Sequence, residues 1–150
     1  MYFELKENRP HGTPEHPFSL YHIKNVPHAF QIPVHWHDEL EIIYVKSGSV
    51  HVTISGEHYI GNTGDAFVVS PGSLHFMGSH TGDVDYYTFL FPLEFVSFQM
   101  NDLSEQMLMA PLKSGRMLFQ IQIGKSIEDL CEHLLVLYAG EGDVRNPIRT

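Results

Sequence analysis

The stretch His35-Trp36-His37-Asp38-Glu39-Leu40-Glu41 decides how the rest of this chain is interpreted. In an extended strand the side chains alternate between two faces, so His35, His37 and Glu41 would emerge on the same face. Two imidazoles and a carboxylate on one face of a strand are three potential metal ligands. Further along, Pro71-Gly72-Ser73-Leu74-His75 places another histidine directly after a turn. His75 is a fourth residue of a type that binds metals.

The chemistry of these four side chains leaves three interpretations open. Neutral imidazoles and one carboxylate suit one divalent transition metal (Zn, Ni, Fe, Mn or Cu), and open coordination positions would admit a small ligand. The same side chains could instead line a metal-free polar pocket that hydrogen-bonds a sugar or an acid. They could also be ordinary core or surface residues. Seven of the other histidines are expected in structural or surface roles: His11, His16, His22, His28, His51, His58 and His80.

Length, composition and charge restrict the class of protein. The 150 residues are 43% hydrophobic and 18% charged, which is typical of one folded domain. The single Cys131 excludes an internal disulfide and fits a reducing cytosol. The N-terminus lacks a signal sequence and no segment is long enough to span a bilayer, so we expect a cytoplasmic protein without a membrane partner. A net charge of −9 disfavours DNA binding by these residues themselves.

Turn-forming residues divide the chain. Residues 1–17 carry Pro10, Pro14 and Pro17 among polar neighbours, which is typical of an arm without regular structure. From residue 18 to residue 91, short apolar runs are broken by glycine, proline and asparagine, which predicts strands. Strands are expected over 50–54, 58–60, 66–70 and 83–91, with turns at 55–57 and 61–65. A meander of this kind protects its edges by closing into a barrel.

The pattern changes after Pro92. It predicts a short helix over 101–109, one more strand over 117–123, and a helix from an N-cap at Ser126 to about Ala139. The last helix carries an amphipathic stripe: Ile127, Leu130, Cys131, Leu134, Leu137 and Tyr138. This stripe either packs on the domain's own sheet or forms a self-associating seam. In the second case the seam residues are Ile127, Leu130, Leu134, Leu137 and Tyr138.

The spacing H-x-H-x3-E-x6-G from His35 to Gly48, followed by G-x2-H from Gly72 to His75, resembles the two motifs of the cupin superfamily. The resemblance implies a mainly β fold, a double-stranded β-helix (jelly-roll) barrel in which the four side chains meet, here with one or two C-terminal helices. One departure is visible: the family usually has proline two places before the second glycine, where this chain has Ser70. Pro71 stands beside the same turn, so we expect the loop geometry to be kept.

The finer pattern over residues 35–45, together with Gly64-Asp65 and residues 70–75, looks like the N-terminal sensor domain of AraC-type transcriptional regulators. The resemblance implies an arm (1–17), a sensor barrel (18–124), a dimerisation helix (125–140) and the start of a linker (141–150). Such a domain binds a small-molecule effector, most often a sugar or similar polar molecule, around His35, His37, Glu41 and His75. The resemblance also implies that the domain forms a homodimer. DNA would be bound only through a C-terminal domain that is not in this chain.

The rival interpretation is a stand-alone cupin enzyme, such as a metal-dependent dioxygenase or a sugar isomerase. Four intact ligands favour it. Catalysis also needs an acid or base beyond the ligands, and the sequence shows no isolated candidate. We therefore expect a sensing domain with no catalytic residues.

Overall fold

The computed structural model describes residues 3–24 and 30–139 of the chain. The predictions for His28, for the Tyr138 side chain and for residues 140–150 fall outside these residues. Among the described helices, none is long and apolar enough to cross a membrane.

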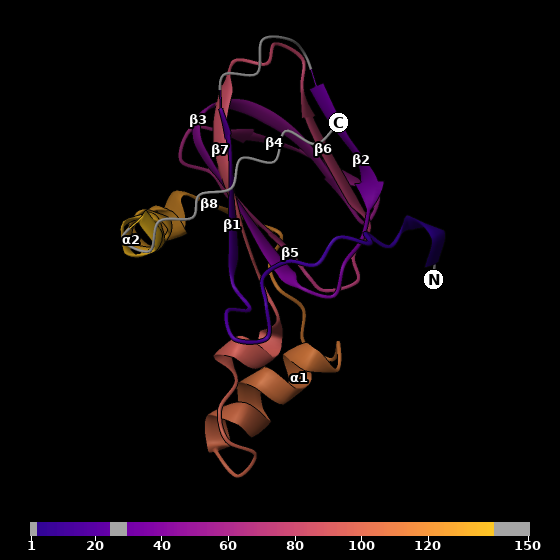
Figure 1. Cartoon of the computed structure of the whole chain (residues 1–150), viewed down its shortest axis with the longest axis vertical. Helices are drawn as coiled ribbons and strands as arrows, with labels where there is room; N and C mark the ends of the chain where they lie inside the picture. The colour runs from indigo at the N-terminus through magenta and orange to yellow at the C-terminus, as the bar shows by residue number, and fades with distance from the viewer. Residues whose placement is uncertain (1–2, 25–29, 140–150) are drawn as a thin grey trace.

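The described residues form eight strands that pair antiparallel and curve into a barrel (Figure 1), as the sequence predicted. Their bounds are β1 (Ser19–Lys24), β2 (Phe30–His35), β3 (Leu40–Ile54), β4 (Glu57–Asn62), β5 (Ala66–Val69), β6 (His75–Ser79), β7 (Val84–Phe91) and β8 (Gln122–Gly124). The predicted hairpin is present between β3 and β4, where Ser55 and Gly56 both have positive φ, as the tight turn requires.

The long strand β3 belongs to two sheets and so joins the walls of the barrel. Its first part, from Leu40 to Gly48, pairs with β7, and its second part, Ser49–Ile54, pairs with β4. At the change-over Gly48 has φ +87°, and a Cβ atom there would lie 2.3 Å from the Asp83 carbonyl oxygen. Only glycine fits this position, because any side chain would clash with the backbone of the neighbouring strand.

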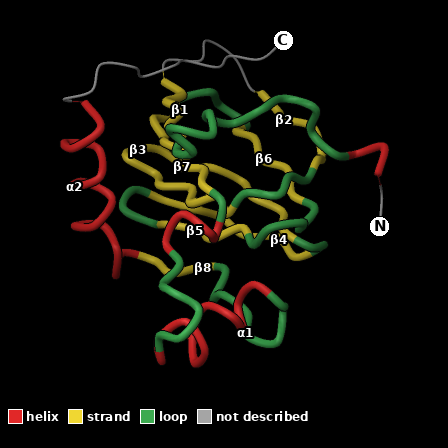
Figure 2. Tube along the Cα trace, turned by 60° about the horizontal axis from the view of Figure 1, so that its bottom comes forward, coloured by secondary structure: helices red, strands yellow, loops and turns green. Residues whose placement is uncertain are grey.

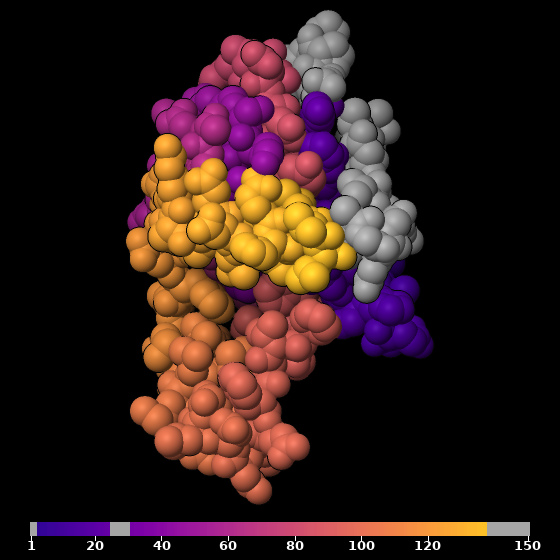
Figure 3. Space-filling model, turned by 90° about the vertical axis from the view of Figure 1, so that its left-hand side faces the viewer, coloured from indigo at the N-terminus to yellow at the C-terminus, as the bar shows by residue number. Residues whose placement is uncertain are grey.

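Apolar side chains fill both faces of the sheet that contains β3. Ile43 and Val45 point into the barrel, whereas Ile42 and Tyr44 pack in a second cluster on the outside. The continuous apolar run from Leu40 to Val45 is explained by this double burial. The outer cluster is covered by α2 (Glu128–Ala139), which lies across the barrel wall in Figure 2 and Figure 3.

A helical region between β7 and β8 protrudes from the end of the barrel (Figure 1). It contains a 3-10 turn (Leu93–Val96), a π-helical turn (Glu105–Met109) and α1 (Ala110–Lys113). The helix predicted over 101–109 is therefore present but continues through Pro111. A proline in a regular helix clashes with the carbonyl four residues earlier, and the wider π turn directly before α1 accommodates the ring.

Two details of the predicted C-terminal part are wrong. The strand expected over 117–123 is reduced to β8, which lies at the edge of the sheet and pairs only with the four-residue strand β5. Ser126 is not the N-cap of a helix: its hydroxyl donates to the Ile123 carbonyl, within a 3-10 turn (Lys125–Ile127) that leads into α2. Gly124, with φ +65°, turns the chain into this 3-10 entry.

The apolar stripe of α2 is divided between two environments. Ile127, Cys131 and Leu134 pack against the outer cluster, as expected for a helix lying on its own sheet. Leu130 and Leu137 are 52% and 72% exposed, so this part of the predicted seam makes little contact within the domain.

Candidate metal centre and cavity

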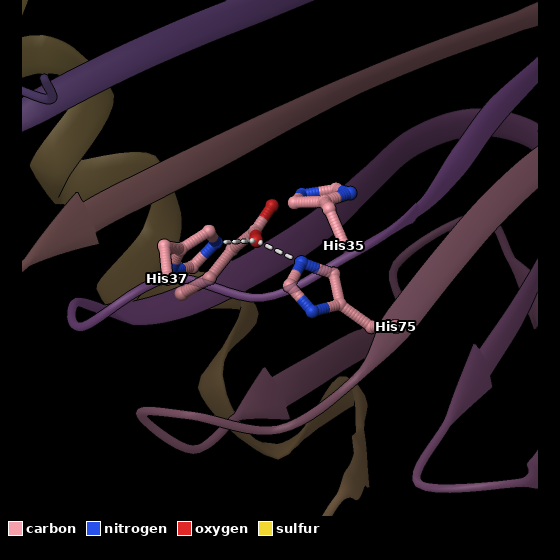
Figure 4. A group of neighbouring side chains, drawn as sticks. His35, His37 and His75 are labelled. Atoms are coloured by element: carbon pink, nitrogen blue, oxygen red, sulfur yellow. Dashed lines mark hydrogen bonds and ion pairs between the residues drawn. The ribbon is translucent and has the colours of Figure 1, made fainter. Parts of the chain in front are cut away.

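Three different elements bring the four predicted ligands together. His35 ends β2 and pairs with His75, the first residue of β6, while Glu41 is the second residue of β3. His37 lies between the strands, where its carbonyl accepts a hydrogen bond from the Gly72 amide and so ties both motifs together. The extended run expected from residue 35 to residue 41 is interrupted after His35, yet the side chains still converge (Figure 4).

The donor atoms of the four side chains form one compact group. The Glu41 Oε2 atom lies 3.0 Å from His37 Nε2 and 3.0 Å from His75 Nε2. One donor atom from each residue, including His35, falls within 4.8 Å of the others. His37, Glu41 and His75 are buried, and His35 is partly exposed toward the adjoining cavity.

Backbone carbonyls orient all three imidazole rings. His35 Nδ1 donates to the Pro33 carbonyl at 2.8 Å, and His75 Nδ1 donates to the Ser73 carbonyl at 2.8 Å. His37 Nδ1 makes the same kind of bond to the carbonyl of Glu39, at 3.1 Å. A carbonyl oxygen only accepts, so Nδ1 carries the hydrogen in each ring, and in the neutral rings Nε2 keeps its lone pair for a metal or a proton.

The electrostatics of the group favour positive charge at its middle, supplied either by protons on the imidazoles or by a metal ion. Two bare nitrogen lone pairs facing an ionised carboxylate oxygen at 3.0 Å would repel one another. Burial disfavours the charged form of Glu41, but hydrogen bonding with His37 and His75 outweighs burial and holds the pKa of this carboxyl well below its usual range. For His37 burial is likewise outweighed by Glu41, which raises the pKa of the imidazole. Burial, followed by the charge of His75, lowers the pKa of His35.

Three Nε2 atoms and one carboxylate, already gathered and oriented, fit a divalent transition metal. This donor set matches the ligands that such ions take in proteins. The ring orientation is fixed through the opposite nitrogen, which is the usual arrangement for histidine ligands. The four residues therefore form a candidate metal centre.

The centre opens into a cavity of about 310 Å³, which the N-terminal arm covers. Residues 4–7 and His11 from the arm contribute to its lining. The sequence predicts only a structural or surface role for His11, because a single histidine in a proline-containing arm has no spacing relation to the motifs. In the structure it is buried, and its ring centre lies 5.5 Å from that of His37.

His11 joins the arm to the barrel. Its Nε2 donates to the Glu7 carboxylate at 2.7 Å, and its Nδ1 accepts from the Tyr21 hydroxyl at 2.7 Å. Burial, followed by the charge of His37, lowers the pKa of His11, which agrees with a neutral ring in these two roles. On the outer side of the arm, Lys6 pairs with Asp38 at 2.7 Å.

The remaining predicted residues fall outside the centre. Trp36 points away from the cavity and is buried beneath the arm, where Phe3 meets it edge to face. Tyr86 and alternate residues of β7 line the cavity, while Tyr87, Phe89 and Phe91 belong to the outer cluster. His51, His58 and His80 are exposed, as expected for surface histidines.

Comparisons with solved structures give similarities of low TM-score. A conserved protein of unknown function from Streptococcus pyogenes is 18% identical with a TM-score of 0.40, over 43% of this chain and 56% of its own. Oxalate decarboxylase from Bacillus subtilis is 27% identical with a TM-score of 0.41, over 54% of this chain and 22% of its own. KdgF from Halomonas sp. is 21% identical with a TM-score of 0.41, over 51% of this chain and 79% of its own.

This chain thus corresponds to about half of the first of these proteins and to less than a quarter of the decarboxylase. No curated protein sequence matches the chain. A family model described as AraC-like ligand binding domain matches residues 9–146, which is most of the chain. The chain belongs to the family of AraC-like ligand-binding domains, which are cupin-type barrels.

Proposed function

We propose that this chain is the effector-sensing and dimerisation domain of an AraC-type transcriptional regulator. The observation that carries the proposal is the cavity between the candidate metal centre and the arm, because a ligand there would touch both at once. A ligand that binds one arrangement of arm, barrel and partner subunit more tightly than another shifts the population toward it. DNA would be bound through a C-terminal domain beyond this chain. The division at residues 17, 124 and 140 remains a prediction.

We infer that the effector is a small molecule bound in this cavity around His35, His37, Glu41 and His75. The family resemblance favours a sugar or a similar small polar molecule. A cavity of about 310 Å³ is at the small end of the range for ligand pockets. At the ~30 Å³ that one water molecule occupies in the liquid, it has room for about ten non-hydrogen atoms.

We also infer that the centre holds one divalent metal ion (Zn, Ni, Fe, Mn or Cu). A bound ion would supply a Lewis acid with positions open for an effector atom. Elemental analysis of untagged protein tests this inference. Wild type is expected to contain about one equivalent of metal, and a variant with His35→Ala and His37→Ala to contain much less. A variant with His51→Ala and His58→Ala removes two exposed histidines and serves as the control. Equal metal content in all three proteins would refute the inference.

The exposed part of α2 supports homodimerisation. Leu130 and Leu137 lie on one side of the helix, and two such helices could bury them against each other. Changing both to glutamate is expected to convert a dimer of twice 17.1 kDa into a monomer in light-scattering measurements. Val136→Glu is the matched control, because Val136 is 73% exposed but lies on a different side of α2. A mass that the Leu130→Glu, Leu137→Glu variant shares with wild type would contradict this seam.

A fusion tests the sensing function as a whole. The chain is joined to a DNA-binding domain that represses a reporter gene only as a dimer. We expect the wild-type fusion to repress and the Leu130→Glu, Leu137→Glu fusion to fail. Compounds that raise the melting temperature of the purified chain should change the wild-type signal. Repression no stronger than that of the DNA-binding domain alone would contradict the proposal.

A second candidate function is a stand-alone metal-dependent enzyme, either a dioxygenase or a sugar isomerase. One observation favours it: Glu7 and His11 line the cavity beside the centre and could act as an acid and a base. Metal-loaded protein is assayed for oxygen consumption with small organic substrates and for interconversion of sugars. Turnover that is lost in a His11→Ala variant with full metal content would support the enzyme, and its absence would favour the sensor.

A further inference from the structure

The walls of the cavity are unevenly polar. The candidate metal centre forms one side, and away from it the barrel contributes the aliphatic side chains of Ile23, Ile32, Met77 and Leu90. Among the described residues that line the cavity there is no asparagine, glutamine, arginine, aspartate or serine. The hydrogen-bonding groups thus lie at the centre, on the arm and on a few hydroxyl-bearing side chains.

This distribution disfavours a ligand that carries hydroxyl groups all round, as a free sugar does. Each hydroxyl placed against the aliphatic wall would lose its water partners and find no replacement. A buried polar group without a partner weakens binding by roughly 5- to 150-fold. A molecule with one polar end and an apolar body avoids this loss, because its body can lie against Met77 and Leu90, which are both buried.

The charge of the centre indicates the nature of the polar end. Three neutral imidazoles and the ionised Glu41 around one divalent cation leave a single net positive charge in a buried place. Two other carboxylates line the cavity, both on the arm rather than at the centre: Glu7, which keeps its charge and accepts a hydrogen bond from His11, and Glu4, which is exposed. A singly charged anionic group beside the centre would therefore neutralise it, which favours burial of the whole group.

We propose that the effector is a small monocarboxylate with an apolar body, whose carboxylate lies at the His/Glu centre and whose body lies against the aliphatic wall. The proposal rests on the sensing function proposed above and narrows its ligand. It also explains how a centre that already contains Glu41 can attract an acid, since the cation and not the protein supplies the positive charge.

Calorimetry on the complete, metal-loaded chain tests the ligand class with four probes. Cyclohexanecarboxylate has both the charged end and the apolar body, in nine non-hydrogen atoms. Cyclohexylmethanol keeps the body without the charge, acetate keeps the charge without the body, and arabinose is polar all round. We expect cyclohexanecarboxylate to bind at least tenfold more tightly than each of the other three. Its binding should be lost after the metal is removed by a chelator.

A variant locates the apolar body. Met77→Gln keeps the size of the side chain and introduces a polar group into the wall, so it is expected to weaken cyclohexanecarboxylate binding at least tenfold at unchanged metal content. Met107→Gln makes the same exchange at an exposed position and should have no effect. If Met77→Gln does not fold, the comparison of the four probes on wild type still decides the question.

Three results would overturn the proposal. They are tighter binding of arabinose than of cyclohexanecarboxylate, equal binding of cyclohexanecarboxylate with and without metal, and no metal in the purified protein. The first result leaves the sensing function intact, because a small molecule still occupies the cavity. Failure of the sensing function is recognised separately, by a reporter fusion that does not repress or whose repression is unchanged by every compound that stabilises the chain.

Discussion

Replacing His11 with alanine should release the N-terminal arm from the barrel while the barrel stays folded. The His11 ring connects Glu7 of the arm with Tyr21 of β1. Without it, the arm keeps two backbone hydrogen bonds to Trp36, the contacts of Phe3 and Lys6 with the Trp36 ring, and an exposed ion pair between Lys6 and Asp38. Such an exposed pair contributes little, typically below about 1 kcal/mol.

The expected size of the effect follows from the two side-chain bonds. The bond with the Tyr21 hydroxyl is between neutral groups and is worth about 1 kcal/mol net. The bond to the Glu7 carboxylate involves a charged group in a mostly buried place and is worth about 2 kcal/mol. A loss of about 3 kcal/mol changes the docking equilibrium of the arm by about a hundredfold.

The only tryptophan of the chain, Trp36, reports arm docking directly. Its ring is 4% exposed beneath the arm, so release should shift its fluorescence to longer wavelength. Hydrogen exchange at the Glu7 and Trp36 amides should accelerate by up to about a hundredfold, with little change in the core of β3. His16→Ala, at an exposed position of the same arm, is the control. Unchanged exchange and fluorescence in His11→Ala would refute this account of the arm.

Three other perturbations follow from the structure. Gly48→Ala should lower the free energy of unfolding in denaturant titrations by more than about 2 kcal/mol, because its Cβ meets the Asp83 carbonyl; Gly56→Ala, also at positive φ but in open space, should cost only about 1 kcal/mol. Burial raises the pKa of Cys131 to about 11, so native protein should react with a thiol reagent at pH 8 far more slowly than unfolded protein; equal rates would contradict its burial. When free metal is present at about 100 times its dissociation constant, adding a chelator should lower the free energy of unfolding by ~2.7 kcal/mol and the melting temperature by roughly 5–10 °C. A variant lacking the first two histidine ligands should not respond.

Regular features of the fold could be predicted because their signals are local. The alternation over residues 50–54 and the turn at Ser55-Gly56 identify a hairpin from neighbouring residues alone. The last helix lies where the periodicity predicts it, and its described residues are Glu128–Ala139. The meeting of the four candidate ligands could be predicted for another reason, because their residue types and spacing resemble the two cupin motifs.

Features that depend on contacts between distant residues could not be predicted. His11 reaches the cavity because the arm folds across the barrel, and no motif or periodicity near His11 predicts where the arm lies. Periodicity groups Ile127, Leu130 and Leu137 into one stripe, but only the position of α2 on the sheet decides which of them is covered. Residues 117–121 alternate like a strand, yet β5 offers an edge of only four residues.

The acceptors that orient the three candidate histidine ligands are main-chain carbonyls, and this has a consequence for how the domain can diversify. The carbonyls of Pro33, Glu39 and Ser73 point as they do because of the turns in which they lie, whatever side chains those positions carry. Substitutions in the cavity wall can therefore change what the barrel recognises without rotating the rings. Recognition and cation binding are separable properties of this scaffold, so a new ligand preference can arise while the centre persists.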